Sequence, residues 1–349
     1  MEQSLIKKNP QFDNHELVSF FFDKETGLRG IIAIHSTKLG PAVGGTRYFP
    51  YNSDEEALED VLRLSRSMSY KCILAGVKYG GGKCVLIAPS QNKIKAKEYL
   101  EAYGRILKEY STKFFTGEDV GMSQNDIEIL GKITPNIIGT KAKAGDPSPW
   151  AALSTYYAIR GALKFLYGDT SLKGKKIIIK GLGKVGMELA RLANEEGAIL
   201  LVSDVDKKRT DQALKSFKNV SVIAPSEFSS HECDIFAPCA LGKDITDYIA
   251  QKIEVKIICG AANNQLVSEK EGVTLFKRGV VYVPDYVANG GGLINVVAEL
   301  SNGGYNKENV LQKCKNIEDE VVTILKESKE TDTAPSEIAD RIAKRALEQ

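Results

Sequence analysis

One short stretch decides the fold of the C-terminal half of the chain: Lys176-Ile177-Ile178-Ile179-Lys180-Gly181-Leu182-Gly183-Lys184-Val185-Gly186. Its isoleucines predict a buried strand over residues 176–179, and the residues that follow predict a helix over 187–196. A Gly-x-Gly-x-x-Gly pattern between a strand and a helix is typical of a dinucleotide-binding turn. The first glycine permits the tight turn, the second lets a pyrophosphate approach the backbone, and the third lets the helix pack closely. Amide donors and the helix dipole then favour the diphosphate.

An acidic residue lies where such a turn needs one. Asp204 follows the next predicted strand, residues 198–202, and stands 23 residues after Gly181. A carboxylate there can accept hydrogen bonds from both ribose hydroxyls, and its charge repels a 2′-phosphate. The sequence therefore favours NAD over NADP as the cofactor. The basic run at residues 207–209 could neutralise such a phosphate, although a run of this kind is typically a solvated surface.

Strands and helices are predicted along both halves of the chain. In the C-terminal half, further strands over 234–237, 255–259 and 280–283 alternate with helical patterns, which predicts a parallel, doubly wound sheet. A loop rich in proline and glycine at 144–150 marks the main domain boundary, and the tail over 308–347 is predicted to be helical. In the N-terminal half, strands are predicted over 17–22, 30–35, 84–88 and 113–116, and helices over 96–110 and after Ser53, where Glu56 is expected to complete a capping box. The glycine-rich stretches at 40–47 and 76–83 are interpreted as loops.

Composition excludes several classes of protein. The 349 residues include 47 Lys and Arg against 45 Asp and Glu, and this near balance argues against nucleic acid as a partner. No apolar run approaches the roughly 18 residues that cross a membrane, and the first ten residues lack the order of a secretory signal, so we expect a cytoplasmic protein. Six scattered cysteines without a C-x-x-C pair, and only three histidines, argue against a metal site and a disulfide framework.

Two lysines and an aspartate are candidates for catalysis. Lys71 lies at the end of the helix that begins after Ser53, Lys83 ends the second glycine-rich stretch, and Asp119 follows the strand at 113–116. Two buried ammonium groups near each other lower one another's pKa, so one could act as a base while the other holds an anion. Taken singly, each lysine is more typical of a surface charge and Asp119 of a turn.

Eight segments, in the same order along most of the chain, resemble the glutamate/leucine/phenylalanine/valine dehydrogenase family, most closely its leucine dehydrogenase branch. They are Pro41-Ala42-Val43-Gly44-Gly45-Thr46-Arg47, Ser69-Tyr70-Lys71, Gly80-Gly81-Gly82-Lys83, Gly117-Glu118-Asp119-Val120-Gly121, Gly181-Leu182-Gly183-Lys184-Val185-Gly186, Ala237-Pro238-Cys239-Ala240-Leu241-Gly242, Gly260-Ala261-Ala262-Asn263-Asn264-Gln265-Leu266 and Pro284-Asp285-Tyr286-Val287-Ala288-Asn289-Gly290-Gly291-Gly292.

The resemblance implies a reaction and a role for each matched residue. It implies that an L-amino acid, NAD and water become a 2-oxo acid, ammonia and NADH. It implies that Lys71 pairs with the substrate α-carboxylate, that Lys83 is the general base acting on water, and that Asp119 carries protons to and from the substrate nitrogen. The implied substrate-binding residues are Lys71, Val43, Gly44, Leu293, Val296, Asn263 and Asn289. The implied cofactor-binding residues are Gly181, Gly183, Lys184, Val185, Gly186, Asp204, Ala240 and Asn263.

The resemblance also implies an architecture. An N-terminal α/β domain over residues 1–143 would bind substrate and form a homo-oligomer. A Rossmann-type, doubly wound domain over 144–329 would bind NAD, with a cleft between the two domains. A C-terminal helix at about 330–349 would pack back on the first domain.

The residues expected to surround the substrate side chain indicate which amino acid is used. Val43 stands where glutamate-specific relatives typically carry a lysine, and the resemblance places Leu293 and Val296 in the same pocket. A γ-carboxylate facing aliphatic groups would lose hydration at a cost of several kcal/mol. We therefore expect branched aliphatic substrates: leucine, valine and isoleucine.

Three departures from the pattern leave alternatives open. Ile138 stands where leucine-type relatives often have threonine, and Gly117 where they often have alanine, which leaves open an aromatic substrate such as phenylalanine or tryptophan. Trp150-Ala151 replaces an aliphatic residue and a threonine, which leaves open a non-catalytic sensor of NADH or of an amino acid.

Overall fold

The computed structural model describes residues 6–89 and 95–349, and the chain divides into two compact units. The first five residues of the N-terminal stretch considered above lie outside this description. The first unit comprises Met1–Asp146, Val296–Tyr305 and Ala343–Gln349, and the second comprises Pro147–Asn295 and Asn306–Ile342. Across the described ranges, no helix is both long and apolar enough to cross a membrane.

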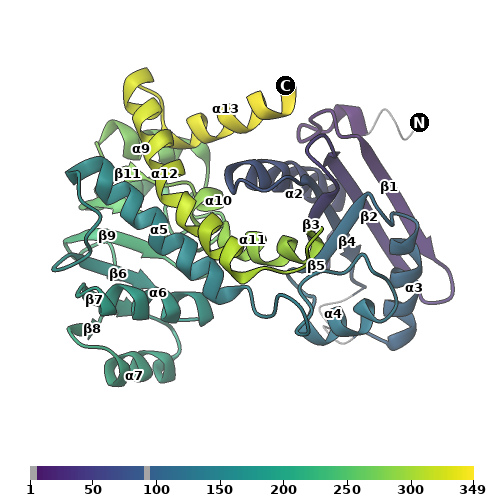
Figure 1. The fold of residues 1–349 in the computed structure, drawn as a ribbon, viewed down its shortest axis with the longest axis horizontal. Coiled ribbons are helices and arrows are strands. Elements are labelled where there is room, and N and C mark those ends of the chain that lie inside the picture. Colours follow the sequence, from purple (N-terminus) through teal and green to yellow (C-terminus); the bar gives the residue numbers. More distant parts are fainter. Residues whose placement is uncertain (1–5, 90–94) are drawn as a thin grey trace. The chain divides into compact units, whose positions relative to one another are not determined.

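The second unit contains a six-stranded parallel sheet in the order β11-β10-β9-β6-β7-β8 (Figure 1). The strands are β6 (Lys176–Lys180), β7 (Ile199–Ser203), β8 (Val220–Val222), β9 (Cys233–Pro238), β10 (Val255–Ile258) and β11 (Val281–Tyr282). The order reverses at β6, which pairs with β7 on one side and β9 on the other. The sheet confirms the predicted parallel Rossmann-type fold, whose ligands bind where the strand order reverses.

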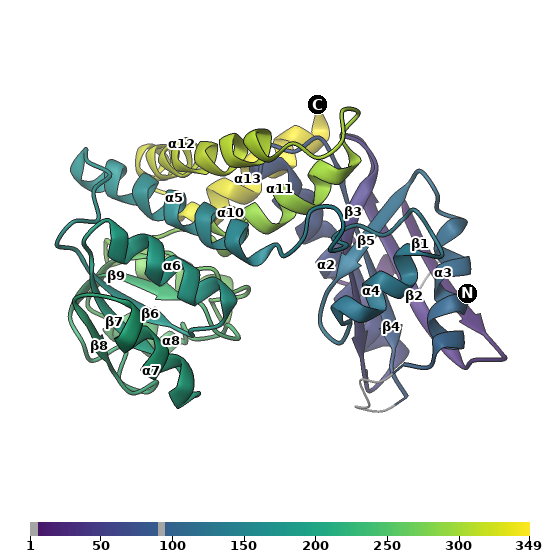
Figure 2. The same cartoon turned by 60° about the horizontal axis from the view of Figure 1, so that its bottom comes forward.

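Helices connect these strands and cover the sheet. They are α5 (Ser148–Tyr167), α6 (Lys184–Glu195), α7 (Lys207–Ser216), α8 (Asp247–Lys252), α9 (Glu269–Lys277) and α10 (Asp285–Ala288). After the last strand come α11 (Gly291–Val297), the 3₁₀ turn η1 (Ala298–Leu300), α12 (Lys307–Thr331) and α13 (Pro335–Glu348). Of these, the end of α11, all of η1 and the end of α13 belong to the first unit. The long helices α5 and α12 lie side by side in both views (Figure 2). A Cβ atom on Gly161 would lie 2.5 Å from the carbonyl oxygen of Glu318, so the two backbones meet closely at this glycine.

The first unit contains a five-stranded mixed sheet in the order β1-β2-β4-β3-β5. Its strands are β1 (Leu17–Asp23), β2 (Leu28–Ser36), β3 (Ala42–Phe49), β4 (Gly80–Ile87) and β5 (Phe114–Glu118). β1 and β4 are antiparallel to β2, whereas β3 runs parallel to both β4 and β5. The parallel group brings the ends of β3 and β5 to the same edge of the sheet.

Helices cover both faces of this sheet, and apolar residues accordingly follow one another along β2 without alternating with polar ones. Ile31 joins a buried cluster with residues of α2 (Asp54–Leu74), such as Leu62. Ile32, one position on, joins a second cluster with Tyr103 of α3 (Lys97–Lys108) and Leu130 of α4 (Gln124–Gly131). Successive side chains of a strand point to opposite faces, so β2 is buried on both.

The interpretation of the two glycine-rich stretches as loops is wrong. Residues 42–49 form β3, and the glycines of residues 80–82 form the start of β4. Glycine is normally unfavourable inside a strand, but here neighbouring backbone comes too close for a side chain. A Cβ atom on Gly44 would lie 1.8 Å from the oxygen of Gly82, and one on Gly81 would lie 2.1 Å from the nitrogen of Ser69.

The helix start at Ser53 is confirmed, but the capping box is wrong. The Ser53 side chain accepts a hydrogen bond from the Glu56 amide, as expected. The Glu56 carboxylate instead accepts from the backbone and side-chain nitrogens of Asn52, at 2.8 and 2.9 Å. It therefore satisfies a donor one residue earlier than the cap.

Candidate active site

Lys83 and Asp119 form an ion pair in the first unit. Lys83 lies on β4 with only 5% of its surface exposed, and its Nζ contacts Asp119 Oδ2. Asp119 follows the last residue of β5, where the chain leaves the sheet. The two residues come from strands on either side of β3, so the register of three strands sets their contact.

Gly45 on β3 makes this contact possible. It pairs with Gly117 of β5, and a Cβ atom at position 45 would lie 2.8 Å from Asp119 Cβ and 3.1 Å from Asp119 Oδ2. Any larger residue at position 45 would therefore displace the aspartate. The paired glycines of β3 have different contacts, because Gly44 faces the backbone of β4 and Gly45 leaves space for the Asp119 side chain.

A second cation lies beside the Asp119 carboxylate. Arg47 Nε lies 3.5 Å from Asp119 Oδ1, and Arg47 Nη1 also pairs with Asp60 Oδ2 at 2.8 Å. Burial alone would raise the pKa of Asp119, but the charges of Lys83 and Arg47 outweigh burial and lower this pKa to about 2. Asp119 is therefore ionised throughout the ordinary pH range.

Lys71 lies in the last turn of α2, which packs against β4. The close approach of Ser69 to Gly81 brings the end of this helix onto the start of the strand that carries Lys83. Lys71 is half-buried. The structure thus places both predicted lysines in the first unit, on two elements in direct contact.

Most of the residues predicted to contact the substrate side chain also belong to the first unit. Val43 is fully buried on β3, and Val296 lies against Gly139, where an added Cβ would be 3.5 Å from Val296 Cγ1. The departures at Gly117 and Ile138 are in contact with each other. A Cβ on Gly117 would lie 2.9 Å from the carbonyl oxygen of Ile138, whose amide donates to Thr116 O at 2.9 Å. Gly117 therefore makes room for the backbone at Ile138. Leu293, by contrast, is a buried residue of α11 in the second unit.

The glycine turn in the second unit has the geometry of a phosphate site. Gly181 has a φ of +100°, and a Cβ on Gly186 would lie 1.9 Å from the Gly181 oxygen, so both positions require glycine. Gly183 has no neighbouring atom within 4 Å of the position of a Cβ. It is also the N-cap of α6, with no side-chain capping bond and no acidic residue in the first turn. The N-terminus of a helix with these features is suited to an anion, and Lys184 and Val185 lie in its first turn.

Asp204 lies beside this turn at the end of β7. Its Oδ2 accepts from the Leu182 amide at 2.6 Å, and its Oδ1 accepts from the Asp206 amide at 2.8 Å. Burial would raise the pKa of Asp204, but these amides and the nearby Arg209 outweigh burial and lower it. Arg209 Nη1 lies 3.4 Å from Asp204 Oδ2, so the arginine of the basic run is paired with this carboxylate.

Two predicted asparagines meet in the second unit. Asn289 Nδ2 donates to Asn263 Oδ1 at 2.7 Å and to the Ala261 oxygen at 3.1 Å.

Two further residues singled out in the sequence also lie in the second unit. Trp150, one of the departures from the family pattern, lies at the start of α5, where its carbonyl oxygen would be 1.9 Å from a Cβ on Gly291. Ala240 is exposed in the loop after β9, and its nitrogen lies 2.7 Å from the position of a Gly181 Cβ, so this loop lies directly against the glycine turn.

Sequence reasoning missed the surroundings of Asp119. Arg47 and Gly45 lie in one of the matched segments, but no function was inferred for either. Nothing in the sequence marks Asp60, which pairs with Arg47, as a functional residue, because acidic residues are common on amphipathic helices. It also missed Gln265, a fully buried residue whose amide donates to the oxygens of Gly260 and Ala262 in the loop that carries Asn263. Only the tertiary contacts distinguish these residues.

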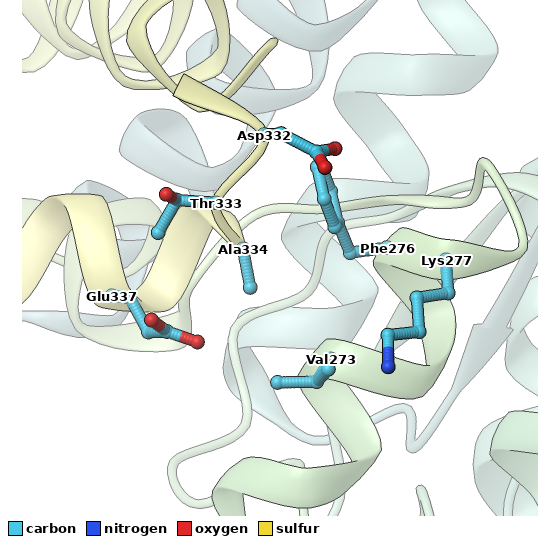
Figure 3. A pocket seen from close by; sticks show the side chains of 7 residues that line it. All are labelled: Val273, Phe276, Lys277, Asp332, Thr333, Ala334 and Glu337. Carbon is cyan, nitrogen blue, oxygen red and sulfur yellow. The ribbon is translucent and has the colours of Figure 1, made fainter.

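A surface pocket of about 390 Å³ in the second unit contains none of these residues (Figure 3). It lies between α9 and the turn from α12 to α13, and its lining residues are Val273, Phe276, Lys277, Asp332, Thr333, Ala334 and Glu337. Over the described parts of the chain, no group of three or more His, Cys, Asp or Glu side chains is placed to hold a metal. The six cysteines are free thiols.

Comparison with known proteins agrees with this arrangement. Residues 15–135 match the Glu/Leu/Phe/Val dehydrogenase dimerisation domain, and residues 149–347 match glutamate/leucine/phenylalanine/valine dehydrogenase. The chain is 41% identical to leucine dehydrogenase of Thermoactinomyces intermedius, over 97% of this chain and 92% of that one. It is also 41% identical to phenylalanine dehydrogenase of Bacillus thermotolerans, over 97% and 89%. The crystal structure of L-tryptophan dehydrogenase from Nostoc punctiforme matches with a TM-score of 0.86 at 36% identity, covering 99% of this chain and 98% of that one. The chain therefore belongs to the Glu/Leu/Phe/Val dehydrogenase family of amino acid dehydrogenases.

Proposed function

We propose that the protein catalyses the NAD-dependent oxidative deamination of a branched-chain aliphatic L-amino acid. In this reaction the amino acid, NAD⁺ and water become the 2-oxo acid, an ammonium ion, NADH and a proton, and the reaction is reversible. The observation that carries the proposal is the buried Lys83–Asp119 pair, because burying two charges is costly and such pairs cluster at functional sites.

Each charged residue has one role in the proposed reaction. Lys71 binds the α-carboxylate of the substrate and orients it. Lys83 removes a proton from the water that attacks Cα after the substrate has lost its hydride. Asp119 accepts and returns a proton at the substrate nitrogen, and its ionised state suits it to accept first.

The second unit fits a dinucleotide. When bound, NAD supplies the acceptor for the hydride that leaves Cα. The N-terminus of α6 and the open backbone at Gly183 suit the diphosphate, and the ionised carboxylate of Asp204 suits the ribose hydroxyls. The charge of Asp204 supports NAD over NADP because it repels a 2′-phosphate, and Arg209 is already paired with this carboxylate. We expect Asp204→Asn to reduce the ratio of kcat/KM for NAD to that for NADP by about tenfold or more.

Aliphatic side chains support a branched aliphatic substrate. Val43 offers no charge to a γ-carboxylate, and the family resemblance assigns two further apolar residues, Leu293 and Val296, to the substrate side chain. At Gly117, the missing Cβ is matched by the backbone of Ile138, so this glycine does not by itself argue for a larger substrate pocket.

A panel of amino acids tests the proposal. NADH formation is measured by absorbance with L-leucine, L-valine, L-isoleucine, L-phenylalanine, L-tryptophan and L-glutamate. We expect the three branched substrates to give the highest kcat/KM and Lys83→Ala to lose at least about a thousandfold in kcat. Fastest turnover of glutamate would refute the pocket argument. Tight NADH binding without turnover of any amino acid would instead support a sensor.

An aromatic amino acid is the second candidate substrate. The specific observation in its favour is that relatives named as phenylalanine and tryptophan dehydrogenases match this chain about as well as leucine dehydrogenases do. Fastest turnover of phenylalanine or tryptophan in the same panel would select it. We further propose that the protein is a homo-oligomer, because residues 15–135 match a dimerisation domain.

A further inference from the structure

The two oxygens of the Asp119 carboxylate have different partners. Oδ2 contacts the Lys83 ammonium, whereas Oδ1 accepts from the backbone amide of Val120 and lies 3.5 Å from both Nε and Nη2 of Arg47. A distance of 3.5 Å is that of a charge interaction and is too long for a strong hydrogen bond. Arg47 therefore acts on Asp119 chiefly through its charge.

Arg47 is fixed from its other side. Its Nη1 donates to Asp60 Oδ2 at 2.8 Å, and the same oxygen accepts from the Tyr51 hydroxyl at 2.7 Å. The other Asp60 oxygen accepts from Arg63 at 2.7 Å. The Arg47 and Asp60 side chains are only 20% and 17% exposed, so the guanidinium has little freedom to turn away from Asp119.

The charged and titratable groups at this place come from four parts of the first unit. They are Lys83 of β4, Arg47 of β3 with Tyr51 after it, Asp60 and Arg63 of α2, and Asp119 after β5. Two carboxylates and three cations alternate, so each carboxylate lies between two cations. The Asp119 carboxylate is thereby shared, with Lys83 on one oxygen and Arg47 on the other.

We propose that Arg47 is a positioning residue of the Lys83–Asp119 pair: held by Asp60, it fixes the Oδ1 side of the Asp119 carboxylate so that Oδ2 faces Lys83, and it places a second positive charge beside the pair. This inference rests on the proposed function for its catalytic meaning, but not for the electrostatic coupling itself. Arg47 touches neither substrate nor cofactor in this scheme and acts through Asp119.

Loss of the Arg47 charge has two opposite consequences for the pair. Asp119 becomes easier to protonate, because one of the two cations that lower its pKa is gone. A positive charge close to the Lys83 ammonium is lost as well, and the loss of a like charge favours the charged state of its neighbour. Because Asp119 stays ionised at the working pH, the second consequence is the one that bears on a lysine acting as a base, and it disfavours the base.

The experiment compares Arg47→Gln and Arg47→Lys with Arg63→Gln. Arg63→Gln is a matched control, because it also removes an ion pair to Asp60 but has no contact with Asp119. For Arg47→Gln we expect kcat for the best amino acid to fall about 10- to 100-fold, with the KM for NAD unchanged within about twofold. We expect the pH at which kcat/KM reaches half its maximum to rise by about half to one unit. Arg47→Lys should restore most of the pH profile, and Arg63→Gln should stay within about twofold of the parent.

A second readout needs no turnover. An imidoester such as methyl acetimidate modifies only deprotonated amines, and mass spectrometry of the peptide that carries Lys83 reports the rate at each pH. In Arg47→Gln the midpoint of this labelling profile should move up by about half to one pH unit, and in Arg63→Gln it should not move. Arg47→Met replaces Arg47→Gln if the latter does not fold.

The outcomes separate this inference from the proposed function. Equal losses in Arg47→Gln and Arg63→Gln, or an unmoved labelling midpoint in Arg47→Gln, overturn the positioning role. A shifted midpoint in a protein that oxidises none of the amino acids leaves the coupling intact and refutes the deamination.

Discussion

At the scale of single residues, Gly45 determines whether Asp119 can reach Lys83. A Cβ at this position would lie 2.8 Å from Asp119 Cβ, a distance that real Cβ atoms do not tolerate, and neither atom can rotate away. We expect Gly45→Ala to fold and to lose about 10- to 100-fold in kcat, because the aspartate must shift by several tenths of an ångström. The control is Gly303→Ala, since a Cβ there meets nothing within 4 Å. Steady-state kinetics checks the prediction, and a Gly45→Ala enzyme within twofold of the parent would contradict it.

The ionisation of Asp119 makes a prediction about stability and pH. Burial would raise its pKa, but Lys83 and Arg47 outweigh burial and lower the pKa from 3.8 to about 2 in the folded protein. A carboxyl whose pKa is lower in the folded state stabilises the fold above its unfolded pKa, and this contribution is lost as the pH falls through the folded value. A difference of this size corresponds to about 2 kcal/mol.

We therefore expect Asp119→Asn to be less stable than the parent by about 2 kcal/mol at pH 7, with the difference shrinking between pH 4 and pH 2. Urea unfolding of both proteins at pH 7, 4 and 3 measures this gap. A gap of the same size at pH 7 and pH 3 would mean that the charge of Asp119 is not what stabilises the first unit.

At the scale of elements, the strands that were not predicted from the sequence, β3 and the start of β4, are those whose glycines pack against neighbouring backbone. The parallel strands of the second unit are recognisable because β-branched residues fill both faces of a buried strand, as Ile177, Ile178 and Ile179 do in β6. β3 and the start of β4 contain runs of glycine, which in isolation favour turns. Their strand structure depends on contacts with α2 and with each other, and no pattern within 10 residues encodes such contacts.

The candidate site likewise contains residues that the sequence predicts and residues that become recognisable only from contacts in the folded chain. Lys83, Asp119 and Asn289 were identified because they lie in segments that resemble a family. Arg47 and Asp60 act through a pairing between β3 and α2 that only folding creates. A charge on a helix face is usually solvated, so the sequence offers no reason to single out Asp60.

Two glycines of the turn between β6 and α6 allow protein stability and cofactor binding to be tested separately. Gly186→Ala would place a Cβ 1.9 Å from the Gly181 oxygen and should destabilise the second unit by more than about 2 kcal/mol. Gly183→Ala meets no atom of the protein, and its extended backbone accepts alanine, so its melting temperature without cofactor should match the parent within about 2 °C. Its methyl group would instead occupy the approach path of the diphosphate.

We accordingly expect Gly183→Ala to weaken NADH binding by about tenfold or more, measured by titration of nucleotide fluorescence. Thermal unfolding of the same samples without nucleotide provides the stability control. Unchanged NADH affinity in Gly183→Ala would place the diphosphate elsewhere.

At the scale of the whole molecule, the first unit presents an apolar face at the edge of its sheet. β1 is an edge strand of this sheet (Figure 1). Phe20 and Phe22 on this strand are 46% and 68% exposed. Val18, two residues before Phe20 on the same face, packs against the cluster beneath α2, so this face of the strand is only partly covered. An exposed pair of phenylalanines beside unpaired backbone is a hazard in a monomer and is suited to contact with another chain.

We expect this face to be covered by a second copy of the chain, in keeping with the match of residues 15–135 to a dimerisation domain. Phe22→Glu would then bury a carboxylate in an apolar contact and should lower the molar mass measured by light scattering, with a concentration-dependent melting temperature. Leu214→Glu is the matched control, because Leu214 is a similarly exposed apolar residue, at 48%, on α7 of the second unit. If Phe22→Glu keeps the parent's mass at micromolar concentration while Leu214→Glu loses it, the association surface belongs to the second unit, and the exposed phenylalanines of β1 need another explanation.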